Sequence, residues 1–256
     1  MARAGCGRDG SIEVNRGRGT FGTVPRSRRP RVPRMLEASC LRDADGDCLV
    51  VETDELAFRR ALNELFFEER SGRHIRRFPA GTLSDGIFRR FESQLDPLLR
   101  QTARLEPAPW RSALRETARR LDGAGVEWWL TGSAALAVRG IPVVPRDLDL
   151  VVSVEGAAAA ATAFDDALIE PAVAVEGWFC RWWGRAWIGA RVEWVGGVTD
   201  AADTPLPTDF GLLAAASLNR VRWNGLTILV PPLELQRAVS ERRGLTDRVR
   251  LIDSLG

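Results

Sequence analysis

Apolar and polar positions along residues 108–256 follow two periods, one typical of helices and the other typical of strands. Helical spacing is seen at Trp110, Leu114, Ala118 and Leu121, and further helices are predicted at 133–138, 157–168, 233–242 and 247–255. Short apolar runs predict strands at 126–130, 147–152, 191–195, 221–223 and 226–230, the last two flanking the hairpin turn Asn224-Gly225. Because the elements alternate without a regular doubly wound series, the predicted fold class is α+β, with a small mixed β-sheet flanked by helices.

Residues 35–107 form a second predicted unit, an N-terminal and mostly helical extension with a short hairpin. The acidic turn Asp43–Asp47 leads into an apolar strand and is interpreted as the hairpin turn. A helix is expected to follow over residues 53–69, because its apolar positions recur at helical spacing. A second helix is predicted around residues 87–99, bent at Pro97.

Residues 1–34 differ in composition from the rest of the chain. They carry nine arginines against Asp9 and Glu13, a net charge of +7, which leaves −5 on the remainder of a chain with a formal net charge of +2. The segment is rich in Gly, Pro and Arg and poor in large apolar residues, so it is not expected to fold alone. Three interpretations stay open: a basic arm for nucleic acid, a disordered tail, or a stretch upstream of a true translation start at Met35.

The composition excludes several classes of chemistry. The chain has no lysine and no tyrosine, so Schiff-base chemistry is excluded and arginine provides every basic side chain. His74 is the only histidine, and no motif for a histidine-based metal site or a Ser-His-Asp triad surrounds it. The four cysteines are scattered without a CxxC pair. Since there is no apolar run of about 20 residues and no signal-peptide core, a cytoplasmic location without a membrane partner is expected.

Two short segments, 130–133 and 147–150, indicate phosphate and metal chemistry. Asp147 and Asp149 stand two positions apart in a predicted strand, so their side chains point to the same face. Two such carboxylates repel each other unless a cation lies between them, and paired oxygen ligands suit Mg²⁺. Gly132-Ser133 joins a strand to a helix, and a helix N-terminus favours anions such as phosphate. The combination predicts a nucleotide site.

The segment Leu130-Thr131-Gly132-Ser133, a spacer, and Asp147-Leu148-Asp149-Leu150 together resemble the signature of the DNA polymerase β-type nucleotidyltransferase superfamily. More narrowly, the chain looks like the small bacterial branches that include antibiotic-modifying and toxin-type nucleotidyltransferases. The resemblance covers about residues 108–256 and implies a nucleotidyltransferase fold. It also implies transfer of a nucleoside monophosphate from a nucleoside triphosphate to a hydroxyl, with release of pyrophosphate. The implied acceptor is a small molecule, a tRNA or a protein hydroxyl.

The resemblance implies roles for particular residues as well. Asp147 and Asp149 are expected to bridge two Mg²⁺ ions about 3.5–4 Å apart, which would clamp the attacking and leaving oxygens of an in-line displacement. Glu193, on a downstream strand, is the candidate third acid, and Asp200 is the alternative. The residues expected to contact the nucleotide are Gly132, Ser133 and Arg146. A glycine lets the backbone approach phosphates closely, and an arginine neutralises their charge.

Two other functions stay open. The first is a catalytically degenerate nucleotide-binding or regulatory module, such as one partner of a toxin–antitoxin-like pair, which would follow if Glu193 failed to converge with Asp147 and Asp149. The second is nucleic-acid binding through residues 1–34. The tryptophan-rich stretch at 178–194 can fill the core or stack a base. The arginines that can reach a triphosphate, or stay on a solvated helix face, are Arg237, Arg242, Arg243 and Arg248.

Overall fold

The structure is a computed structural model that describes residues 35–44 and 46–254. These residues belong to one compact unit of the chain. The three interpretations of residues 1–34 lie outside the described residues, so the fold concerns the predicted extension and the predicted principal domain.

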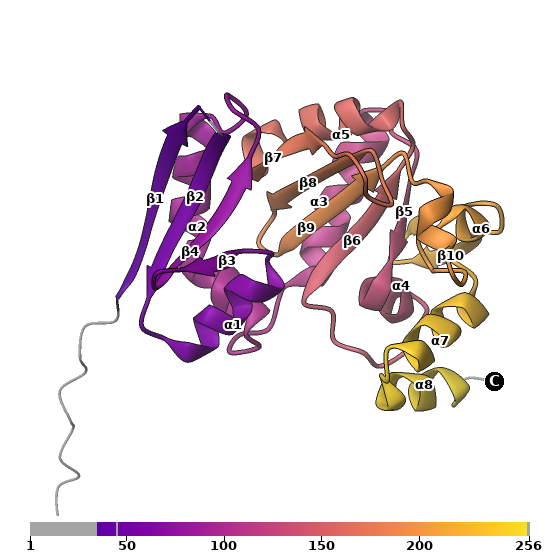
Figure 1. The fold of residues 1–256 in the computed structure, drawn as a ribbon. Helices are drawn as coiled ribbons and strands as arrows, with labels where there is room; N and C mark the ends of the chain where they lie inside the picture. Colours follow the sequence, from indigo (N-terminus) through magenta and orange to yellow (C-terminus); the bar gives the residue numbers. More distant parts are fainter. Residues whose placement is uncertain (1–34, 45, 255–256) are drawn as a thin grey trace, which may run out of the picture. The chain divides into compact units, whose positions relative to one another are not determined.

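Five strands form the principal sheet, in the order β5-β6-β9-β8-β7 (Figure 1). The strands are β5 (Trp128–Thr131), β6 (Asp147–Val152), β9 (Arg191–Gly196), β8 (Trp182–Trp187) and β7 (Leu168–Ala174). β6 and β9 run parallel, and the other neighbouring strands run antiparallel. Because this mixed sheet is flanked by helices, the predicted α+β class is confirmed.

Alternation along the strands gives this sheet one apolar face. The helices that pack on that face are α3 (Trp110–Gly123) and α5 (Gly156–Ala163). Leu148 on β6 and Trp194 on β9 are buried there. Gly184 on β8 makes room for Trp194, because a Cβ at this position would overlap the indole ring. Since side chains alternate between faces, the acids predicted on the same two strands point to the opposite, open face.

The C-terminal part of the chain packs near the β5 edge of the sheet (Figure 1). Its elements are α6 (Leu212–Ala215), β10 (Asn219–Trp223), β11 (Leu226–Val230), α7 (Leu233–Arg242) and α8 (Thr246–Asp253), and single 3-10 turns lie at Asp165–Ala167 and Asp200–Asp203. The predicted hairpin is confirmed: Asn224 and Gly225 join β10 to β11 with φ values of 47° and 84°, as a type I′ turn requires. α7 contacts the short helix α4 (Gly132–Val138), and Gln236 Nε2 donates to the Gly132 carbonyl over 3.0 Å.

A second sheet, in the order β1-β2-β4-β3, forms the N-terminal region. Its elements are β1 (Leu36–Asp43), β2 (Gly46–Thr53), α1 (Leu56–Glu64), β3 (Glu68–Arg70), β4 (Arg73–Phe78) and α2 (Asp85–Thr102). α2 contacts both β1 and β7, and Arg90 on α2 donates to the Leu168 carbonyl over 2.9 Å. One apolar core therefore continues from the N-terminal sheet into the principal sheet.

Residues 35–107 contain more strand than the mostly helical extension that the sequence predicts. The helix expected to reach residue 69 ends at Glu64, because Phe66 adopts a left-handed backbone with φ 64° and the chain turns into β3. Strand β4 is hard to recognise since four of its six residues are Arg or His. The Arg76 guanidinium lies over the Phe78 and Trp183 rings, 5.6 and 4.9 Å from their centroids, so aromatic stacking makes a basic residue compatible with a half-buried strand.

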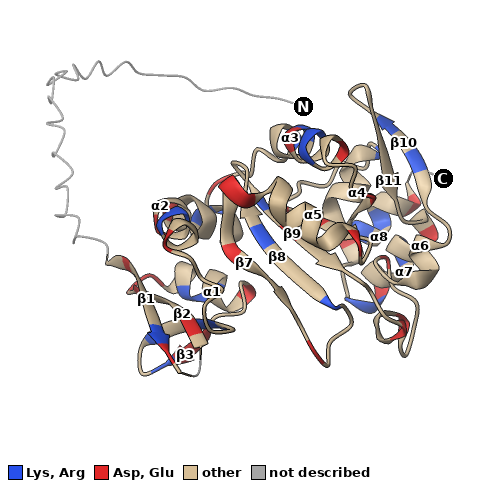
Figure 2. Cartoon of the chain, turned by 90° about the horizontal axis from the view of Figure 1, so that it is seen from above, with Lys and Arg blue, Asp and Glu red and all other residues tan. Residues whose placement is uncertain are grey.

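Surface features of the described residues agree with an ordinary globular chain. Acidic and basic side chains are interspersed over the elements in the view of Figure 2. None of the helices in the described part of the chain has both the length and the apolar character needed to cross a membrane. Cys40, Cys48 and Cys180 are present as free thiols.

His74 provides a test of how the N-terminal sheet responds to pH. Its side chain is fully buried in β4, and neither ring nitrogen has a hydrogen-bond partner among the described residues. Burial lowers the pKa of His74 below its usual value of 6.5. Below about pH 6.5 the unfolded chain therefore binds a proton at His74, whereas the folded chain binds it only at a lower pH. The free energy of unfolding consequently falls as the pH decreases.

We expect His74→Leu to gain stability relative to the unmodified chain as the pH decreases from 7 to 5. The gain should be at most about 1.4 kcal/mol for each pH unit below the unfolded-state value. Urea unfolding of both proteins at each pH measures the difference, in which the titration of carboxylates distant from His74 cancels. Glu69, whose Oε2 lies 3.9 Å from His74 Nε2, is the carboxylate that contributes to it. A difference that is constant between pH 7 and 5 would show that the imidazole is not excluded from protonation in the fold.

Candidate active site

A row of polar side chains crosses the open face of the principal sheet. The strand register places one residue from each strand in this row: Thr131, Asp149, Glu193, Arg185 and Glu170. The next row pairs Asp147 with Arg191 across β6 and β9. Residues directly opposite each other on neighbouring strands point to the same face. The three predicted acids therefore lie together on one face, as the alternation of their strands requires.

Asp149 has no compensating cation of its own. It is half-buried, and no hydrogen bond or ion pair joins its carboxylate to another side chain in the described part of the chain. Burial raises the pKa of Asp149 well above its usual range, and the negative charges of Asp147 and Glu193 raise it further. Such a carboxylate favours binding of a proton or a metal cation.

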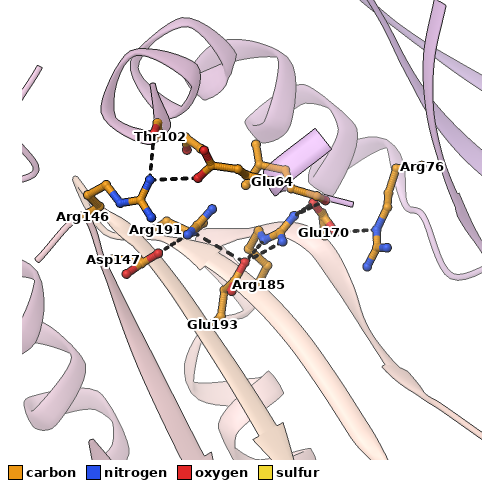
Figure 3. A network of polar contacts seen from close by, with 10 residues as sticks. Glu64, Arg76, Thr102, Arg146, Asp147, Glu170, Arg185, Arg191 and Glu193 are labelled. Atoms are coloured by element: carbon orange, nitrogen blue, oxygen red, sulfur yellow. Dashed lines mark hydrogen bonds and ion pairs between the residues drawn. The ribbon is translucent and has the colours of Figure 1, made fainter. Parts of the chain in front are cut away.

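Glu193 lies in the opposite electrostatic environment. Arg185, which is completely buried on β8, donates from Nε to Glu193 Oε1 over 2.6 Å and also pairs with Glu170 (Figure 3). Burial alone would raise the pKa of Glu193, but the guanidinium groups of Arg185 and Arg191 bring it below its usual value. The row continues toward the N-terminal sheet, where Arg76 Nε lies 3.4 Å from Glu170.

Arg191 connects the two rows. Its guanidinium pairs with Asp147, and its Nε lies 3.5 Å from Glu193 Oε1 (Figure 3). Burial opposes the charged form of Arg191, but the three surrounding carboxylates outweigh burial and raise its pKa. Its Nη1 is buried and has no hydrogen-bond partner among the described residues. One donor of this arginine therefore remains without a partner among the described residues.

Gly132 and Ser133 stand where β5 turns into α4, as predicted. Gly132 has a left-handed backbone, with φ 64°, and a Cβ added to it would lie 2.6 Å from Asp149 Oδ2. Only glycine therefore allows the Asp149 carboxylate to approach this turn. Ser133 lines the larger of two cavities beside the site.

Arg146 contacts the N-terminal region instead of the acid beside it in the sequence. Its Nη1 pairs with Glu64 over 2.8 Å and donates to the Thr102 carbonyl over 3.2 Å (Figure 3). It also lines the larger cavity. Arg146 thus holds the start of β6 against α1 and α2 while facing the site.

Two cavities meet at Asp149. The smaller, of about 510 Å³, has aromatic walls formed by Phe66, Trp178, Phe179, Trp183 and Phe210. The larger, of about 890 Å³, is lined by charged residues of both signs. They are the arginines Arg104, Arg146, Arg191, Arg243 and Arg248 and the acids Glu64, Glu106, Asp147, Asp149 and Asp247. Gly132, Asp149, Arg243 and Arg248 line both. One side of the site thus suits planar apolar groups, and the other side suits phosphates.

The sequence did not predict one residue of the site and left the roles of others open. Asp209 is buried on the wall of the aromatic cavity, and burial raises its pKa. Its carbonyl accepts a hydrogen bond of 2.9 Å from Thr131 Oγ1, but it stands in a loop, where no periodicity marks it. Arg243 and Arg248 line the cavities, whereas Arg237 pairs with Asp253 over 2.6 Å. Asp200, the alternative third acid, is exposed.

The three predicted acids differ in how well they suit a metal ion. In the described part of the chain, no group of three or more His, Cys, Asp and Glu side chains is arranged to hold a metal ion. Asp147 and Asp149 provide two carboxylates on one strand face, which fits the needs of Mg²⁺. Glu193, in contrast, is occupied by two arginines. The donor set therefore fits an ion at the aspartates better than one completed by Glu193.

Comparisons with known proteins give a family match to part of the chain and a similar solved structure. Residues 97–172 match the family model described as "Phosphoribosyl-dephospho-CoA transferase MdcG C-terminal domain". This match supports a transferase with a nucleotidyltransferase-type fold. It includes Gly132, Ser133, Asp147 and Asp149 and ends before Glu193.

A solved structure from Thermotoga maritima, described as a "putative nucleotidyltransferase", is 22% identical to this chain. The similarity covers 59% of this chain and 94% of that chain, with a TM-score of 0.44. Among curated proteins, none matches the chain. The antibiotic-modifying and toxin-type branches remain a prediction.

The close approach of Gly132 and Asp149 can be tested with a matched pair of substitutions. Gly132→Ala and Gly140→Ala both place a side chain at a positive φ, 64° and 91°, but only the first meets a neighbour. We expect both to lose about 1–2 kcal/mol of stability from backbone strain. Only Gly132→Ala should lose more and also displace Asp149. Thermal unfolding measures the loss of stability, and nucleotide binding measures the displacement of Asp149. Equal losses in Gly132→Ala and Gly140→Ala would show that residue 132 does not approach Asp149 as closely as described.

Proposed function

We propose that this chain is a Mg²⁺-dependent nucleotidyltransferase that moves a nucleoside monophosphate from a nucleoside triphosphate to a hydroxyl and releases pyrophosphate. The observation that carries the proposal is the position of Asp149, an uncompensated carboxylate between an arginine-lined cavity and an aromatic cavity. The family match over residues 97–172 supports a transferase of this general kind.

The triphosphate would lie in the arginine-lined cavity. Arg243 and Arg248 line it, and neither guanidinium has an ion-pair partner within the described residues. Burial, and then the positive charge of Arg243, lower the pKa of Arg248. Two neighbouring guanidinium groups without anions are stabilised by phosphate oxygens, which they can bind through paired N–H donors. Gly132 would let the backbone approach the same phosphates.

Asp147 and Asp149 are the residues that would hold Mg²⁺ beside this triphosphate. When bound, the ion would neutralise phosphate charge and polarise the phosphorus for attack. Glu193 suits the role of general base poorly, because its carboxylate accepts hydrogen bonds from Arg185 and its pKa is lowered. Its function in this proposal is to orient Arg185 and Arg191 around the aspartates.

The aromatic cavity would receive the planar or apolar part of a substrate. Phe66 and Trp178 on its wall are 51% and 42% exposed, so their rings are accessible to a ligand. Aromatic walls with a few polar groups are typical of cofactor and nucleotide pockets. The name of the matched family adds phosphoribosyl-dephospho-CoA as one donor group to test. The acceptor hydroxyl would belong to a small molecule, a tRNA or a protein.

A second candidate function is a nucleotide-binding module without catalysis. The pairing of Glu193 with Arg185 and Arg191 favours it, because the third acid is not free to complete a catalytic centre. This candidate predicts tight triphosphate binding with no release of pyrophosphate. Incubation of the chain with each labelled triphosphate, Mg²⁺ and a cell extract separates the two functions, since only the transferase labels an acceptor.

Asp149→Asn is expected to abolish turnover without unfolding the chain. The substitution keeps the shape of the side chain and removes the charge that would bind Mg²⁺, an interaction worth several kcal/mol in such sites. The loss of pyrophosphate release should therefore be at least about 100-fold. Asp200→Asn is the matched control, because Asp200 is exposed and lines neither cavity. Unchanged turnover in Asp149→Asn would rule out the proposed role.

Arg243→Ala and Arg248→Ala are expected to weaken triphosphate binding. Each removes charge-assisted hydrogen bonds, so the KM for the triphosphate should rise by about tenfold or more. Arg250→Ala is the control, since its side chain is 80% exposed and pairs with Asp247. Steady-state kinetics and equilibrium binding of a triphosphate measure the effects. An equal response of all three variants would argue against a phosphate site in this cavity.

A further inference from the structure

We infer that Arg191 acts as a permanent cation in place of one of the two metal ions expected from the sequence, so that the site binds a single divalent ion at Asp147 and Asp149. The inference rests on the proposed function and concerns how that reaction is assisted. Three observations support it: Arg191 pairs with Asp147 and lies beside Glu193, Asp149 has no ion-pair partner among the described residues, and Arg191 Nη1 has no hydrogen-bond partner there.

The guanidinium of Arg191 lies between two of the three acids that would surround a second ion. The parallel register places Arg191 directly opposite Asp147, and Glu193 follows two positions later on the same face. The side chain pairs with Asp147 and lies 3.5 Å from Glu193 Oε1. It is 8% exposed, so surrounding protein holds it in place. A divalent ion bridging these two carboxylates would have to displace it.

The pairing of charges leaves room for one further cation. Asp147 is paired with Arg191, and Glu193 is paired with Arg185. Asp149 alone among the three acids has no ion-pair partner among the described residues. Because an unpaired buried charge is costly, one ion beside Asp149 would complete the compensation. A second ion would place excess positive charge next to two buried guanidinium groups.

Arg191 also has a buried donor without a protein partner in the described part of the chain. Its Nη1 lacks a partner among the described residues, and the side chain lines the larger cavity together with Arg243 and Arg248. A bridging metal ion would connect the carboxylates to a phosphate oxygen. Arg191 can make the same connection, because its fork of N–H donors binds carboxylate on one side and phosphate on another. Unlike an ion, it cannot be removed by a chelator.

The number of bound ions tests the inference directly. Mn²⁺ is titrated into the full chain in the presence of a non-hydrolysable triphosphate analogue, and bound ions are counted by electron paramagnetic resonance. One Mn²⁺ per chain supports the inference. Two per chain would overturn it while leaving the proposed function intact. No bound Mn²⁺ would contradict the metal-dependent function itself, and the inference with it.

Substitution of Arg191 tests whether this residue limits the number of bound Mn²⁺ ions to one. Arg191→Met should bind a second Mn²⁺, because Asp147 is released and Glu193 keeps only Arg185 as a partner, whereas Arg191→Lys should still bind one. Arg250→Met is the control and should also bind one. Thermal unfolding shows which variants are folded. If Arg191→Met does not fold, the number of Mn²⁺ ions bound by the unmodified chain and by Arg191→Lys tests the inference instead. One ion in each supports it, and two ions in either would overturn it. A folded Arg191→Met with a single ion would contradict the exchange of arginine for metal.

Discussion

The compensation of buried charge across the principal sheet is the constraint on which the rest of the structure depends. Arg185 is completely buried between Glu170 and Glu193, and it reaches them from the middle strand of the three. Removing one partner from such a group typically costs about 3–5 kcal/mol, because a charge is left uncompensated in the interior. The order of the strands and their register must therefore bring opposite charges into the same row. This requirement also determines which acid remains available at the site.

Asp149 and Glu193 illustrate the consequence. They lie directly opposite each other on neighbouring parallel strands, and both are acids on the open face. Burial and the negative charges of Asp147 and Glu193 raise the pKa of Asp149. In contrast, the ion pairs of Glu193 with Arg185 and Arg191 outweigh burial and lower the pKa of Glu193. Two chemically similar residues thus acquire different capacities. One can bind a cation, and the other stabilises the arginines that surround it.

The N-terminal region forms part of the same site. Arg76 on β4 contacts Glu170, Glu64 on α1 contacts Arg146, and Gln101 on α2 donates to the Gly189 carbonyl over 3.0 Å. Phe66, whose left-handed backbone ends the segment after α1, lines the aromatic cavity. A strained conformation of a bulky residue persists only where its surroundings compensate for it.

Local patterns in the sequence were sufficient for the features that depend on near neighbours. The alternation around Asp147 and Asp149 gave their common face, Gly132 marked the turn into α4, and Asn224-Gly225 gave the hairpin. The α+β class followed from the same periodicities.

Only the tertiary structure decided the rest, because it depends on contacts between residues far apart in the chain. Of the sheet made by residues 36–78, the hairpin at Asp43–Asp47 was predicted and is confirmed. Strands β3 and β4 were missed, since β4 is stabilised by rings from elsewhere and not by its own apolar pattern. Glu193 could be proposed as an acid, but its pairing with Arg185 requires the register of β8 and β9. The positions of Arg191 and Asp209 beside Asp149 have the same origin. Backbone periodicity is a property of a segment, whereas the charge that surrounds a side chain is a property of the packed whole.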